Sequence, residues 1–70
     1  MKEDVSYIQG GIETLNWSLA DMLNWMKQNA AHFKGVTYKK GMSAGQLLDL
    51  MSPEQLTFVR DHIRQMAEAS

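Results

Sequence analysis

The chain of 70 residues contains no cysteine. Disulfide bonds are therefore excluded, and so are the common zinc sites that use thiolate ligands. A chain this short buries only about 60% of the surface that its unfolded form exposes, so its own core provides little stability. Small domains gain further stability from disulfides, metals or association, and the composition favours association. The lack of cysteine is also compatible with the reducing cytoplasm, which we take as the expected compartment.

The sequence also lacks a long apolar run and a large net charge. No stretch approaches the roughly 18 apolar residues that span a membrane, and Glu3 and Asp4 stand where a signal peptide would become apolar. The formal net charge at pH 7 is −1, whereas proteins dedicated to nucleic-acid binding carry excess positive charge to contact phosphates. We therefore expect a soluble protein without membrane contact.

Residue patterns typical of catalysis or cofactor binding are missing. A nucleophilic site needs a serine or cysteine beside an oriented histidine, but His32 and His62 each lie at the end or flank of a predicted helix. No set of His, Asp or Glu repeats at metal-ligand spacing, and Gly10-Gly11 supplies only two glycines for a phosphate-binding loop. We expect no enzyme activity, no catalytic residues, no cofactor and no metal.

What the sequence does contain is a regular apolar stripe in its first half. The apolar positions alternate steps of three and four residues along Val5, Ile8, Ile12, Leu15, Leu19, Met22 and Met26. This spacing is a heptad, which predicts one long amphipathic helix over about residues 5–33. Gly35 can take the left-handed conformation that ends such a helix.

The pair Gly10-Gly11 leaves a second interpretation open. Two glycines in a helix interior cost about 2 kcal/mol relative to two alanines, so the helix can instead begin near Ile12 and cover residues 12–33. Residues 5–8 would then form a minor extended arm, able to pair with residues 36–38 as a small ribbon.

Two capping boxes divide the second half of the chain after a loop at residues 34–42. Ser43 is followed three residues later by Gln46, and Ser52 by Gln55, the pattern that starts helices. Pro53 suits the first helical position. We predict a short helix over residues 44–51 and a C-terminal helix over residues 53–67, whose inward stripe is Leu56, Val59, Ile63 and Met66. The expected fold class is all-α, in a single small helical domain that covers residues 1–70.

Helix lengths lead to a prediction about association. A helix over residues 5–33 is about 42 Å long, whereas one over residues 53–67 reaches only about 22 Å. Part of the first helix's stripe would stay in water unless another chain buried it. We therefore expect a homodimer that associates through Ile8, Ile12, Leu15, Leu19, Met22 and Met26.

Aromatic residues outside the stripe suggest contacts with another protein. On a helical wheel Trp17 falls nearly opposite the stripe and Trp25 falls to one side of it. Tryptophan is common both in cores and at interfaces. A second surface of the helix, with Tyr7 and the small Gly11 along it, would permit close approach of the C-terminal helices or of another chain. We predict a small regulatory or inhibitory adaptor that binds a protein partner through Trp17, Trp25 and Tyr38.

The alternative interpretation is a small dimeric DNA-binding regulator. A short helix followed at a tight turn by a longer one has the order of a helix-turn-helix motif, whose second helix enters the major groove. The contacts would come from Lys39, Lys40, Arg60 and Arg64. Acidic residues on the same helix, such as Asp61, oppose this interpretation.

The second capping box gives a direct test of the predicted C-terminal helix. Replacing Ser52 by alanine removes the side-chain acceptor for a backbone N–H at the helix start, so we expect a loss of about 1 kcal/mol in the free energy of unfolding. Urea denaturation followed by circular dichroism measures this loss. An unchanged stability would contradict the assignment of Ser52 as the cap.

Overall fold

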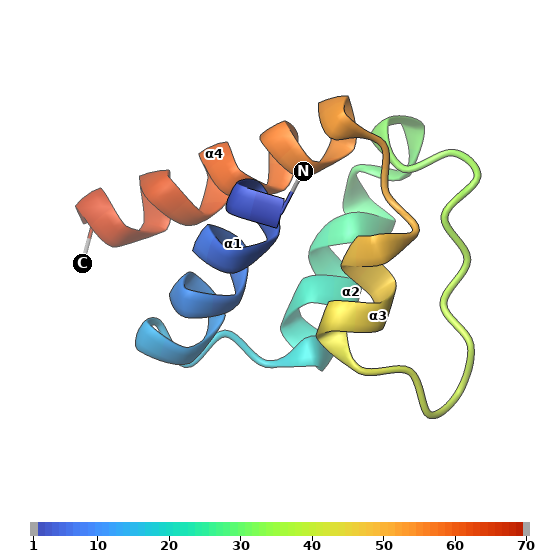
Figure 1. Cartoon of the computed structure of the whole chain (residues 1–70), viewed down its shortest axis with the longest axis horizontal. Helices are drawn as coiled ribbons and strands as arrows, with labels where there is room; N and C mark the ends of the chain where they lie inside the picture. The colour runs from blue at the N-terminus through green and yellow to red at the C-terminus, as the bar shows by residue number, and fades with distance from the viewer. Residues whose placement is uncertain (1, 70) are drawn as a thin grey trace.

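The computed structural model describes residues 2–69, apart from the side chains of residues 2 and 3, and shows helices joined by loops (Figure 1). The elements are α1 (Lys2–Thr14), α2 (Leu19–Gln28), the short 3₁₀ helix η1 (Ala30–His32), α3 (Ala44–Asp49) and α4 (Pro53–Ala69). No strand occurs in the described part of the chain. The predicted all-α class is therefore confirmed.

The predicted single long helix is wrong, because the chain turns between α1 and α2. The N–H of Trp17 donates to the carbonyl of Ile12 over 3.0 Å, and the N–H of Asn16 donates to the carbonyl of Glu13 over 3.3 Å. Asn16 has φ 54, in the left-handed region. Together these features form a Schellman motif, which satisfies the last carbonyls of α1 and ends it. In the sequence the heptad spacing of apolar residues continues through this turn, although the helix itself ends there.

A third capping box starts α2 at Ser18. The backbone N–H of Asp21 donates to Ser18 Oγ over 3.0 Å, and the N–H of Ser18 donates to Asp21 Oδ2 over 3.2 Å. The predicted pattern used glutamate or glutamine three residues after the cap. Here the shorter aspartate makes the same reciprocal bond, and its charge suits the positive end of the helix dipole.

The alternative break at Gly10-Gly11 is also wrong, because α1 runs through both glycines. Residues 5–8 are helical and not extended, so the proposed ribbon with residues 36–38 does not form. A Cβ placed on Gly11 would overlap the Cγ2 atom of Ile63 on α4, whereas a Cβ on Gly10 would meet nothing within 4 Å. Gly11 therefore allows α1 to approach α4 closely, as the small residues on its second surface suggested.

The second half of the chain follows the predicted order. Helix α2 ends at Gln28, earlier than expected, and η1 then leads to Gly35, which has φ 85. The two predicted capping boxes are confirmed, with Gln46 N–H to Ser43 Oγ and Gln55 N–H to Ser52 Oγ both at 3.2 Å. In the structure α3 covers Ala44–Asp49 and α4 covers Pro53–Ala69.

The core forms where α1, α2, α3 and α4 meet. Its buried apolar residues are Ile8, Met22, Met26, Phe33, Leu47, Leu48, Met51, Leu56, Val59 and Ile63. Figure 1 shows α1 lying beside α4, and α1 also packs against α3. The inward stripe of the C-terminal helix is confirmed, since Leu56, Val59 and Ile63 are buried and Met66 packs against them. The turn at residues 15–18 thus lets one chain bury most of its own stripe.

The two adjacent glycines of α1 should respond in opposite ways to the same substitution. Gly10→Ala places a methyl group in open space and reduces the flexibility of the unfolded chain, so it should stabilise the protein by roughly 0.5–1 kcal/mol. Gly11→Ala forces the methyl against Ile63 and should destabilise it by roughly 1–3 kcal/mol. Urea denaturation of both variants provides the measurement. Equal effects at the two positions would rule out the close contact at Gly11.

Candidate functional site

A groove runs along the surface between α1 and α4. Its volume is about 350 Å³. The residues that line it are Ser6, Tyr7, Gly10, Gly11, Thr14, Leu15, Ile63 and Ala67. The α1–α4 groove follows from the glycines, because two successive positions of α1 present backbone where other residues would present side chains. The sequence thus creates a hollow beside the contact of Gly11 with Ile63.

The α1–α4 groove is mainly apolar and open to solvent. Ile63 contributes buried aliphatic surface, Leu15 is half-buried at the end of α1, and Gly10 is exposed. Tyr7 stands at the edge with 46% of its surface exposed, which makes it one of the three exposed large hydrophobic residues of the described chain. The groove therefore offers an aromatic ring and aliphatic carbon to any segment that lies along it.

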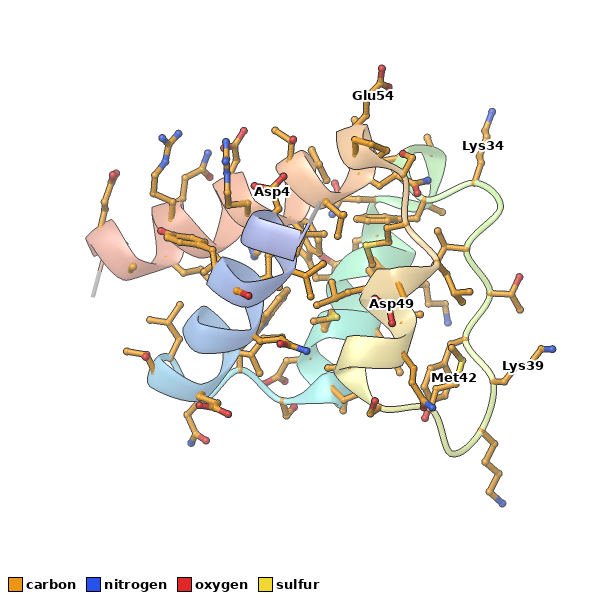
Figure 2. All side chains as sticks on the ribbon, in the orientation of Figure 1. Asp4, Lys34, Lys39, Met42, Asp49 and Glu54 are labelled. Carbon is orange, nitrogen blue, oxygen red and sulfur yellow. The ribbon has the colours of Figure 1, made fainter. Side chains whose placement is uncertain are left out.

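A basic hollow adjoins the α1–α4 groove at Tyr7. This second cavity has a volume of about 450 Å³ and is lined by Asp4, Tyr7, Arg60 and Arg64. Arg60 Nη1 donates to Asp4 Oδ1 over 3.0 Å, and Figure 2 shows Asp4 at the start of α1 beside α4. The lining thus holds two arginines and one carboxylate, and a second carboxylate, that of Asp61, lies 3.7 Å from Arg64.

Six rings form an aromatic cluster that joins α2 to α4. They are Trp17, Trp25, His32, Phe33, Phe58 and His62. Trp25 stacks on Phe58 with centroids 5.2 Å apart and on His62 with centroids 4.3 Å apart. Since Phe58 and His62 lie on successive turns of α4, the indole of Trp25 ties α2 to both turns. Trp17 contacts the Trp25 ring edge-on at 5.7 Å.

Comparison with known protein families, curated proteins and solved structures found no match.

The predicted partner-binding residues lie in two different places. The structure brings Trp17 and Trp25 together, and both are half-buried against rings of their own chain. Tyr38 lies in the loop before α3, with 38% of its surface exposed, and has no part in this cluster. The ring contacts show that Trp25 packs α2 on α4 and that Trp17, in the turn before α2, contacts His62 of α4.

The predicted self-association residues are divided by the turn between α1 and α2. Ile8, Met22 and Met26 are buried in the core of the chain, and Ile12, Leu15 and Leu19 are half-buried against it. Only Leu15 of this set lines the α1–α4 groove. The homodimer was predicted because one long helix would have been too long for the C-terminal helix to cover. That reason no longer holds, because α1 and α2 contain 13 and 10 residues and do not form one long helix.

The predicted nucleic-acid contacts do not converge on one face. Figure 2 shows Lys39 projecting from the loop that contains both lysines, while Figure 1 shows α4, whose middle and C-terminal part carry Arg60 and Arg64, running away from that loop. Arg60 is also engaged by Asp4. The arrangement gives the lysines and arginines no shared surface for DNA.

The predicted site set omitted Gly10 and Tyr7, which define the α1–α4 groove. Tyr7 and Gly11 share a helical face, so a sequence signal for a second surface existed. What the sequence did not show was that α4 packs against this face and that Arg60 and Arg64 line a hollow together with Tyr7.

The described residues 2–69 contain neither a membrane-spanning helix nor a cluster of metal ligands. None of the helices there is both long and apolar enough to span a membrane. Nor do three or more His, Asp or Glu side chains gather there in the manner of a metal site.

The packing of His62 predicts a pH dependence of stability. Burial lowers the pKa of His62 below its ordinary value of 6.5, because the folded environment disfavours the charged imidazolium. The unfolded chain therefore takes up this proton first, and stability that is fully present above about pH 6.5 is lost as the pH falls through the lower folded pKa.

Urea denaturation between about pH 7.5 and 5 should show this loss in the native chain, and NMR titration of His62 should give a midpoint below 6.5. In the His62→Gln variant the decrease over the same pH range should be smaller, whatever its stability at neutral pH. Identical slopes for the two proteins would contradict the role of His62.

Proposed function

We propose that this chain is a small non-enzymatic protein-interaction module, an adaptor whose α1–α4 groove receives an apolar segment of a partner protein. The observation that carries the proposal is the exposed Tyr7 ring above a groove whose wall is bare glycine backbone at Gly10. Backbone without side chains lets a second protein approach closely, and aromatic residues at the edge of such a surface supply large contact areas.

The openness of the α1–α4 groove favours a protein segment over a small molecule. Small ligands usually occupy pockets that bury most of their surface. Ser6, Tyr7, Gly10 and Thr14 are all exposed along α1, so a small molecule lying there would keep much of its own surface in water. A partner helix or extended segment would bring further surface of its own to cover these residues.

The occupant we favour is a protein of different sequence. Self-association remains the competing occupant, since Leu15 from the predicted interface lines the groove. Most of that predicted stripe, however, is already covered by the chain's own core. DNA binding gains no support from the arrangement of Lys39 and Arg60.

The proposal predicts that filling the α1–α4 groove prevents partner binding without unfolding the chain. Gly10→Gln places a long side chain in the groove, and the open space at Gly10 accommodates its Cβ. Ala20→Gln is the matched control, because Ala20 is exposed on α2 and does not line the groove. Circular dichroism of both variants checks that the helices persist.

Each protein is then immobilised, and proteins captured from a lysate of the producing organism are compared by quantitative mass spectrometry. A partner retained by the native chain and by Ala20→Gln should decrease about ten-fold or more with Gly10→Gln, as expected for loss of a central contact. Undiminished capture by Gly10→Gln, or capture of no partner by the native chain, would overturn the proposal.

A further inference from the structure

We propose that the segment bound in the α1–α4 groove carries a carboxylate next to its apolar side chain, and that Arg64, with Arg60 beside it, binds this carboxylate. This inference rests on the function proposed above and names the chemistry of the partner. Its basis is the junction at Tyr7, whose ring lines both the apolar groove and the basic hollow.

Arg64 is available for an external anion. Its Nη2 atom lies 3.7 Å from Asp61 Oδ1, and the two side chains are 58% and 42% exposed. That distance is too long for a good hydrogen bond, and exposed pairs of this kind contribute little. A partner carboxylate at Arg64 would therefore displace only a weak interaction, and a guanidinium binds carboxylates through two parallel N–H groups.

Arg60 has a different part in the same hollow. Its Nη1 atom is held by Asp4, whose side chain is only 16% exposed, so the guanidinium is fixed in position. An arginine has five N–H donors, and the bond to Asp4 uses one of them. Arg60 thus adds positive charge at a defined place, while Arg64 reaches out to the ligand.

The combination of surfaces favours an acidic apolar protein segment over other anions. A nucleic acid would need several phosphate contacts, and the apolar groove of Gly10, Leu15 and Ile63 gives a phosphate backbone nothing to pair with. A fatty acid shares the carboxylate and the apolar carbon, but its long chain would need a deep cavity. The groove is open along α1, and this openness favours a protein segment over a fatty acid.

A matched pair of probes separates the two parts of the site. Phenylbutyrate has an aromatic ring, a short alkyl chain and a carboxylate, and phenylbutanol has a neutral hydroxyl in place of the carboxylate. Each is titrated into the isotope-labelled full chain, and the amide signals of Gly10 and Gly11 report binding in the groove by NMR. Both probes should shift these signals only at millimolar concentration, because small molecules in so open a groove keep much of their surface in water and bind weakly.

Phenylbutyrate should bind roughly two- to five-fold more tightly than phenylbutanol, the range expected for one exposed ion pair. Arg64→Gln should remove this difference and leave phenylbutanol binding unchanged. Lys39→Gln removes the same charge from the loop before α3 and should leave the difference intact.

The outcomes distinguish the two proposals. If neither probe shifts the glycine signals, the groove does not bind apolar ligands, and both the proposed function and this inference are wrong. If both bind equally, or if Arg64→Gln leaves the preference for phenylbutyrate unchanged, only the carboxylate recognition is wrong. Palmitate binding many-fold more tightly than phenylbutyrate would overturn the inference in favour of a lipid site.

Discussion

The reversal of the chain at residues 15–18 is the constraint on which the rest of this fold depends. Asn16 takes a left-handed conformation that ends α1, and Ser18 with Asp21 starts α2 two residues later. Asparagine adopts this conformation at lower cost than most residues, because its short polar side chain can bond locally. The apolar stripe is thereby divided between two helices that contribute Ile8 and Met22 to one core. Without this reversal the chain could not cover its own apolar surface.

The close approach of α1 to α4 depends on a second feature of the local sequence, the glycine at position 11. A glycine weakens an isolated helix, but here it removes the atom that would collide with Ile63. Elsewhere on α4 the indole of Trp25, from α2, stacks on Phe58 and His62. Helix α4 is therefore held both by its close backbone approach to α1 and by aromatic stacking with α2. The neighbouring Gly10 has no such neighbour, and the bare backbone there becomes accessible surface.

This division of packing also decides which aromatic residues are free for other contacts. Trp17 and Trp25 make their contacts within the chain, whereas Tyr7 contributes its ring to a surface that leads from aliphatic carbon to two arginines. The proposed recognition of a segment that is apolar on one side and charged on the other rests on this large exposed ring between an apolar groove and a charged hollow. The tryptophans stabilise the scaffold on which this surface is presented.

The sequence by itself determined the features that depend on neighbours a few residues apart. The starts of α3 and α4 follow from Ser43 and Ser52 bonding three residues ahead, and the buried face of α4 follows from its spacing of apolar residues. The turn at Asn16 was equally local, but the heptad spacing continued across it and hid the signal. Only the tertiary structure decided that Gly11 contacts Ile63 and that Tyr7 lines one hollow with Arg60 and Arg64, because such pairs join distant parts of the chain. The bond between Arg60 and Asp4 spans 56 positions, and the side-chain spacing along one helix contains no information about which distant helix will pack against it.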